Sequence, residues 1–277
     1  MTFSVLARDP ETGELGIAVA SCILAVGRAV PRARPGVGLV AVQARSPRGL
    51  GGVLLSGLAE GTRPADLARR AAHAAEDAMP QVAVLSATGE VAADTGPEAF
   101  PEAGHRTGGA PGAGVAVLGN MLASPAVLPA MLEAFGAARG ALPDRLLVAL
   151  AAGDEAGGDL RGRQSAALLV VGGEAETADD DGVRVDLRVD DATDPVAQLR
   201  VLRTLQRAHA EADYATLAVF APEGARDLYA ALAAAQRGDR AQAVDALRAM
   251  RERPGWSRWL AAMAGDERLA GISRLLG

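Results

Sequence analysis

Residues 2–21 read TFSVLARDPETGELGIAVAS, two short apolar segments separated by a turn sequence. Residues 2–8 and 15–21 are rich in the β-branched and aromatic side chains that suit strands, and the intervening DPETG combines residues that favour turns. The stretch therefore predicts an antiparallel β-hairpin at the start of the chain. Since Thr2 follows Met1 directly, it either begins a strand or becomes an N-terminal nucleophile once Met1 is removed.

The rest of the chain groups its strands in hairpins instead of alternating them singly with helices. Such grouping predicts largely antiparallel sheets and excludes a doubly wound parallel sheet. Apolar residues on both strand faces also predict sheets that are covered on both sides. We therefore expect an α+β fold, a four-layer αββα sandwich. The predicted strands are 37–44, 81–96 as a hairpin, 114–120, 165–173 and 183–191; the predicted helices lie on either side of Gly61 and at 125–139, 142–152 and 195–212; residues 97–113 are predicted as a loop.

The composition changes after residue 212, where only helical patterns remain. Two amphipathic tracts separated by Gly238-Asp239 have the small-residue spacing of a tetratricopeptide-like helical hairpin, although a single copy is a weak signal. We expect two domains, 1–212 as the sandwich and 222–277 as a small helical module. The module offers a surface for a protein partner, and its alanine-rich helices would also suit a homo-oligomer.

The charge pattern excludes several classes of function. The chain has 28 basic and 34 acidic residues, a net charge of −6, and no long basic run, so we expect no nucleic-acid partner. No apolar stretch has the length of a membrane span. All basic residues other than histidine are arginines, which excludes any mechanism that needs a lysine amine.

The single cysteine, Cys22, rules out an internal disulfide. The N-terminus also lacks the apolar block of a signal peptide. Both observations lead us to expect a cytoplasmic protein. No nucleotide-binding or zinc-protease motif occurs, and the acidic runs at 179–181 and 190–194 lack the alternating spacing of a calcium loop. We expect no cofactor and no metal.

Several ordered segments resemble one protein family across about residues 2–210. They are TFSVLARDPETGELGIAVAS, AVGRAVPRARPGVGLVAVQA, GHRTG, GNMLASPAV, GGDLRGRQSAALLVV and VDLRVDDATDPVAQLR. These blocks resemble the domain of unknown function 1028 family, a group regarded as similar to the N-terminal nucleophile (Ntn) hydrolases. The resemblance implies the αββα sandwich and a hydrolase that acts through its N-terminal residue.

Thr2 is the first catalytic candidate. Removal of Met1 would give a threonine with a free α-amine, whose ordinary pKa near 7.7–8.0 makes it a usable base. An adjacent base activates a hydroxyl that is otherwise a poor nucleophile. Ser21, at the end of the return strand, could hydrogen-bond the new N-terminus or cap its own strand. Asn120 could supply an amide to the oxyanion or satisfy a buried loop.

Five further residues are substrate-binding candidates, each with a structural alternative. Gln43 could donate from its side chain, or it could satisfy a buried loop. Arg34 could lend a positive field to the site or remain a surface residue, and His105 lies on a loop where it could touch substrate. Arg163 could clamp a carboxylate or pair with Asp159 or Asp190, and Ser165 opens the strand after the same glycine-rich loop.

These residues predict an Ntn-type amidohydrolase that cleaves a small-molecule amide through a Thr2 acyl-enzyme. Two alternatives remain open. One is a catalytically silent binding or assembly protein with the same sandwich, and the other is a hydrolase with a different nucleophile that retains Met1. The sequence names neither the amide nor the partner.

Overall fold

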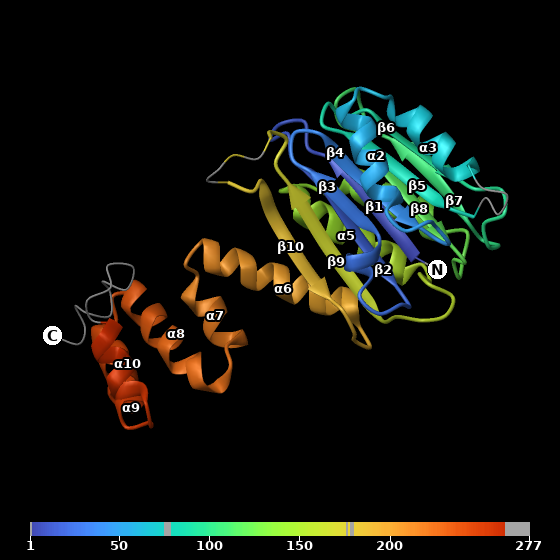
Figure 1. Cartoon of the computed structure of the whole chain (residues 1–277). Coiled ribbons are helices and arrows are strands. Elements are labelled where there is room, and N and C mark those ends of the chain that lie inside the picture. Colours follow the sequence, from blue (N-terminus) through green and yellow to red (C-terminus); the bar gives the residue numbers. More distant parts are fainter. Residues whose placement is uncertain (1, 75–78, 176, 178–179, 264–277) are drawn as a thin grey trace. The chain divides into compact units, whose positions relative to one another are not determined.

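The predicted N-terminal hairpin is present, with β1 (Thr2–Arg8) antiparallel to β2 (Leu15–Ser21). The computed structural model describes residues 2–74, 79–175, 177 and 180–263. Within these residues, ten strands form two antiparallel sheets, accompanied by ten helices (Figure 1). The predicted mixed α+β class with antiparallel sheets is confirmed.

The larger sheet, sheet A, has six described strands in the order β10-β9-β2-β1-β8-β7. The smaller one, sheet B, has four described strands in the order β3-β4-β5-β6. The strands of sheet A beside the hairpin are β7 (Gly104–Gly108), β8 (Val115–Asn120), β9 (Ser165–Val171) and β10 (Val183–Val189). Those of sheet B are β3 (Pro31–Arg34), β4 (Gly38–Gln43), β5 (Gln81–Ser86) and β6 (Val91–Thr95).

Side chains of β1 alternate between two buried environments, because successive residues of a strand point to opposite faces. Phe3 lies against α5 (Leu142–Glu155), where a Cβ on Gly153 would be 3.3 Å from the Phe3 ring, and Met131 of α4 (Val127–Ala137) packs on the same glycine. Leu6 points the other way, into the apolar core between the two sheets. Both faces of this strand are therefore apolar and covered.

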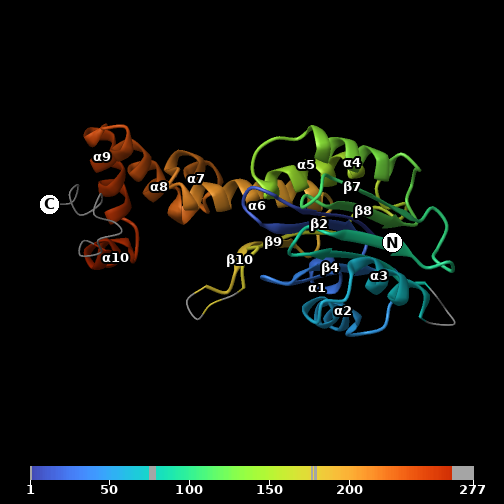
Figure 2. The same cartoon turned by 90° about the horizontal axis from the view of Figure 1, so that it is seen from above.

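The outer face of sheet B packs on α2 (Leu50–Ala59) and α3 (Pro64–His73). Figure 2 shows these two helices beyond β4, and α4 and α5 beyond the opposite face of sheet A. Between the sheets, the core is built from aliphatic side chains of both, including Leu6, Ile17, Leu39, Leu85 and Leu118.

Three short elements that precede β8 were not predicted from the sequence. The segment 97–113, predicted as a loop, contains β7, whose exposed GHRTG residues pair with β8 through the backbone. An edge strand of this kind has no apolar alternation to reveal it. Ahead of the third predicted strand, α1 (Val26–Ala29) and β3 are also present, both only four residues long.

The chain divides into two compact units, Met1–Arg200 and Val201–Gly277. The predicted bounds of 1–212 and 222–277 stay a prediction, and residues 264–277 lie outside the described part. The helices after β10 are α6 (Pro195–Ala210), α7 (Tyr214–Phe220), α8 (Glu223–Gln236), α9 (Arg240–Arg251) and α10 (Trp256–Met263).

The C-terminal unit has its own apolar cluster, centred on Leu228, Leu232, Leu247 and Met250. The predicted break between α8 and α9 is present. Gly238 has a φ of 80°, which ends α8, and the Asp239 side chain caps α9 by accepting a hydrogen bond from the Gln242 backbone N–H. The missed helix α7 has the same kind of cap, from Asp213.

Two glycine-to-alanine changes should have opposite effects on stability. A Cβ on Gly38 would lie 2.5 Å from the Leu85 carbonyl oxygen, which belongs to the paired strand and cannot move freely. We expect Gly38→Ala to lower the free energy of unfolding by about 1–3 kcal/mol. Gly136 is exposed inside α4 with nothing within 4 Å of a Cβ, so Gly136→Ala should raise it by about 0.5–1 kcal/mol. Urea denaturation of both variants checks this; equal effects would contradict the packing.

Candidate functional site

A row of polar side chains crosses one end of sheet A. The strand register pairs Thr2 with Asn120 and Ser21 with Ser165, and the hydroxyls of Thr2 and Ser21 lie 3.2 Å apart within hydrogen-bond distance. All four residues are buried. Because paired residues project from the same face of a sheet, four strand ends contribute to a single polar row.

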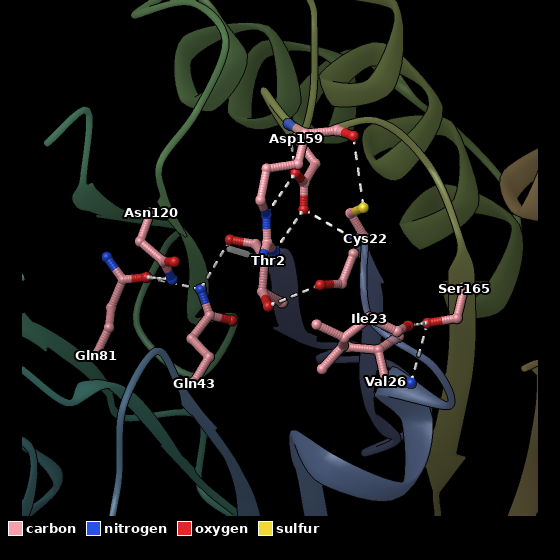
Figure 3. A network of polar contacts seen from close by, with 11 residues as sticks. Thr2, Cys22, Ile23, Val26, Gln43, Gln81, Asn120, Asp159 and Ser165 are labelled. Carbon is pink, nitrogen blue, oxygen red and sulfur yellow. Dashed lines mark hydrogen bonds and ion pairs between the residues drawn. The ribbon is translucent and has the colours of Figure 1, made fainter. Parts of the chain in front are cut away.

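Sheet B carries a second polar row that faces the first. Its register pairs Gln43 with Gln81 and Gln81 with Thr95. Gln43 reaches across to sheet A, where its Nε2 donates to the Thr2 carbonyl oxygen at 3.2 Å and its Oε1 accepts from the Ser4 hydroxyl at 2.7 Å. In Figure 3, Gln43, Gln81 and Asn120 gather on one side of Thr2, and Cys22 and Ser165 on the other.

The orientation of every amide in these rows follows from Gln81. Its Nε2 lies 2.9 Å from the Gly104 carbonyl oxygen and 2.8 Å from that of Gly119. Carbonyl oxygens only accept, so the nitrogen of Gln81 must face them and its Oε1 must face the other way. There Oε1 accepts from Gln43 Nε2 at 2.7 Å and from Asn120 Nδ2 at 3.1 Å.

This chain of constraints leaves one atom without a partner. With its nitrogen committed to Gln81, Asn120 must turn its Oδ1 away, and no described residue donates to that buried oxygen. A buried acceptor without a donor costs about 1–3 kcal/mol. Native structures avoid such groups unless a ligand, water or functional role accounts for them. Asn120 Oδ1 is therefore an available acceptor directly across the sheet from Thr2.

Thr2 itself is well enclosed. Only 4% of the residue is exposed, its carbonyl oxygen accepts from Gln43 and its hydroxyl contacts that of Ser21. The predicted proximity of Ser21 to the start of β1 is thus observed. Met1, whose removal the nucleophile hypothesis requires, lies outside the described residues.

Asp159, predicted from the sequence only as a partner for Arg163, contacts the backbone beside the polar row. Its carboxylate accepts from the backbone N–H of Cys22 at 2.8 Å and from that of Arg161 at 2.9 Å. Asp159 therefore fixes the backbone immediately after Ser21. The sequence marks this glycine-rich loop as a candidate part of the site. It contains no local pattern that predicts the contact between Asp159 and Cys22, which are 137 residues apart.

Ser165 fixes the next part of the same segment. Its hydroxyl donates to the Ile23 carbonyl oxygen at 2.5 Å and accepts from the Val26 N–H at 3.0 Å. Figure 3 shows both contacts. The structure thus places the Ser165 hydroxyl against the loop between β2 and α1, while Asp159 holds the start of that loop.

His105 lies on β7 and connects with the second polar row. Its Nδ1 is 2.9 Å from the Thr95 hydroxyl, which in turn lies 3.0 Å from Gln81 Nε2. His105 is exposed overall, but partial desolvation of its ring by the groups around it lowers its pKa below the ordinary value, and the negative charge of Asp94 opposes this in part. The neutral imidazole is therefore favoured at the edge of the network.

The two arginine candidates lie differently from expectation. Arg34 pairs with Gly38 at the start of β4, whereas Gln43 ends that strand. Arg34 is therefore exposed at the opposite end of sheet B from the polar rows, which favours the alternative of a surface residue over a positive field at Thr2. Arg163 donates to Asp154 at 2.9 Å, not to either predicted partner. This bond raises the pKa of the Arg163 guanidinium.

Two further features bear on the class of site. Within the described residues, no group of three or more His, Cys, Asp or Glu side chains could hold a metal ion; Asp179, from one acidic run, lies outside them. No helix in the same part of the chain is long and apolar enough to span a membrane.

Comparison with known proteins gives a family and a similar structure. The DUF1028 family, described as a family of unknown function, matches residues 2–199. A crystal structure of a DUF1028 protein from Silicibacter pomeroyi is 34% identical to this chain, with a TM-score of 0.64. The match covers 75% of this chain and 88% of that one. No curated protein matches the chain.

Replacing Gln81 by glutamate should test the orientation of the network. A carboxylate cannot donate to the Gly104 and Gly119 carbonyl oxygens, and it would be buried without a cation. We expect Gln81→Glu to lower the free energy of unfolding by about 2–4 kcal/mol near neutral pH. Burial would raise the glutamate pKa in the folded state, so the loss should shrink as the pH falls. Urea denaturation at several pH values measures this, with exposed Gln198→Glu as the control; equal effects of the two changes would contradict the network.

The lowered pKa of His105 gives a pH-dependent contribution to stability. The unfolded chain binds a proton near the ordinary pKa, whereas the folded protein resists protonation to lower pH. The contribution is therefore complete above about pH 6.5 and is lost as the pH falls through the folded pKa. Thermal unfolding from about pH 7.5 to about pH 5 should show a smaller loss of stability for His105→Gln than for wild type. Identical slopes would contradict the lowered pKa of this imidazole.

Proposed function

The chain belongs to the DUF1028 family, and from that premise we propose that it is an Ntn-type amidohydrolase that uses Thr2 on a small-molecule amide. We infer with it the four-layer αββα sandwich. The support for this architecture is that α4 and α5 pack on sheet A while α2 and α3 pack on sheet B.

One observation carries the proposal. The Thr2 hydroxyl lies 3.2 Å from the Ser21 hydroxyl within a buried polar row, at the N-terminal end of a central strand. A threonine that merely begins a strand needs no such surroundings. Ser21, held by the loop contacts of Asp159 and Ser165, would orient the Thr2 oxygen for attack.

The chemistry requires only the atoms of Thr2 as nucleophile and base. Removal of Met1 converts the Thr2 amide nitrogen into an amine, and burial favours its neutral form over the ammonium form. The amine takes the proton from Oγ while Oγ forms a bond to the substrate carbonyl carbon. The same proton then passes to the leaving nitrogen as the C–N bond breaks, and water hydrolyses the ester that remains.

Asn120 has a different role here from the one its residue type suggested. Its Nδ2 already donates to Gln81, and its Oδ1 is the atom without a partner. Since Asn120 is the register neighbour of Thr2, we assign Oδ1 as an acceptor for the new Thr2 amine. Gln43 Nε2 donates to Thr2 O and to Gln81 Oε1. Both hydrogens of Gln43 Nε2 are thereby used, so Gln43 would hold Thr2 in position and would not donate to the substrate.

A catalytically silent binding protein is the second candidate. Its support is the low exposure of Thr2 and the internal use of both Gln43 hydrogens, which suit a rigid scaffold. The two candidates differ in whether Met1 is removed and whether Thr2 reacts.

The state of the N-terminus decides between these candidates. We expect the intact mass of the natively expressed protein to lack Met1, and a threonine-directed β-lactone probe to label the wild type. Thr2→Ala should abolish labelling, and because alanine is also small enough for Met1 removal, the loss would report the hydroxyl alone. Thr2→Ser should retain labelling.

Exposed Thr88→Ala, at the tip of a hairpin, is the control and should label like wild type. Retention of Met1, or equal labelling of wild type and Thr2→Ala, would reject the nucleophile and favour the silent protein.

A further inference from the structure

A cavity of about 500 Å³ lies between the segment of α1 and β3 and the segment that connects β4 with α2. Its volume is within the range of small-molecule sites. Val42 lines the cavity, whereas the next residue, Gln43, points toward sheet A. The cavity is therefore on the opposite face of β4 from the Thr2 network.

The lining of this cavity has one sign of charge. Arg28, Arg32 and Arg48 contribute three guanidinium groups, and none of the described lining residues is acidic. Among the described residues, none of the three is paired with a carboxylate. The whole chain has a net charge of −6, so this concentration of positive charge is a local feature.

Arg32 is held in place by its surroundings. Its Nη1 donates to the Arg28 carbonyl oxygen at 3.0 Å and to the Pro31 carbonyl oxygen at 2.6 Å. Its aliphatic part lies on α2, where a Cβ on Gly51 would come within 2.8 Å of the Arg32 Cγ. A positioned guanidinium loses less entropy on binding than a free surface side chain.

The glycines at the start of α2 leave part of the lining open. A Cβ on Gly49 or Gly52 would meet no heavy atom within 4 Å, and Gly49 has a φ of 84°, which favours glycine. These residues leave backbone and space uncovered beside the arginines, and the Ser46 side chain also lines the cavity. A ligand could approach the guanidinium groups without displacing a side chain in this part of the lining.

We propose that this cavity binds a small molecule through a carboxylate or phosphate group. Guanidinium groups match the planar, bidentate geometry of both anions, and three of them without a carboxylate would repel one another unless an anion bound between them. The inference does not depend on Thr2 as a nucleophile, because it concerns binding on the other face of β4.

Isothermal titration calorimetry at low ionic strength tests the proposal, with inorganic phosphate and succinate as separate probes and uncharged succinamide as the reference. We expect phosphate, succinate or both to bind wild type, and succinamide not to bind. The double variant Arg28→Gln with Arg48→Gln should weaken binding by about tenfold or more. Both arginines are exposed, so the variant should fold, as circular dichroism can verify.

Two controls make the result specific. Arg70→Gln, an exposed change on α3 outside the cavity, should leave binding unchanged, and so should Thr2→Ala. The probe that binds more tightly identifies the anion. Absence of binding by both anions at millimolar concentration, or equal binding by wild type and the double variant, would overturn the proposal.

Discussion

The register of β1 against its two neighbours is the constraint on which the rest of the structure depends. A slip by one residue would send every side chain of β1 to the opposite face, so Thr2, Ser4 and Leu6 would exchange places with Phe3 and Val5. Phe3 and Val5 would then enter the core between the sheets, and Thr2 and Ser4 would be buried on the side of α5 without their present hydrogen-bond partners. Because both faces of the strand are buried, side-chain fit and the hydrogen bonds of Thr2 and Ser4 specify this register together with the hydrophobic effect. The position of the Thr2 hydroxyl beside Ser21 and Asn120 follows from it.

Between the sheets, hydrogen bonds determine the orientation of the amide side chains, which packing alone does not specify. The two carbonyl oxygens of Gly104 and Gly119 orient Gln81, which in turn orients Gln43 and Asn120. An amide suits this position because it carries a donor and an acceptor on one planar group. The same sequence of constraints ends at Asn120 Oδ1, the acceptor without a donor. In the proposed catalysis at Thr2, Asn120 therefore accepts a hydrogen bond through Oδ1, because its nitrogen already donates to Gln81.

Charge is distributed unevenly over the arginines. Near the polar rows, Arg161 is paired with Asp159 and Arg163 with Asp154, so their charge is largely neutralised where they lie. On the other face of β4, Arg28, Arg32 and Arg48 have no such partners in the described part of the chain. The ion pairs of Arg161 and Arg163 hold the loop beside the site in place. The three arginines of the cavity lack a carboxylate partner among the described residues, so an external anion would bind there most favourably.

Much of the fold was predictable from local pattern, and most of the site was not. Alternation and turn residues identified the hairpins and the antiparallel class, and the contact between Thr2 and Ser21 followed because a hairpin brings its own two ends together. The edge strand β7 escaped because it pairs through its backbone alone. Asp159 and Gln81 were missed as network residues, and Arg34 lies at the end of its sheet away from Thr2.

By itself, then, the sequence determined most of the strands and the apolar character of their faces, since these depend on periodicity within a few residues. Only the tertiary structure decided that Asn120, Gln81 and Asp159 lie near Thr2. Strand order and register join residues that are far apart in the chain, such as Cys22 and Asp159 at 137 positions, a separation that no local pattern encodes.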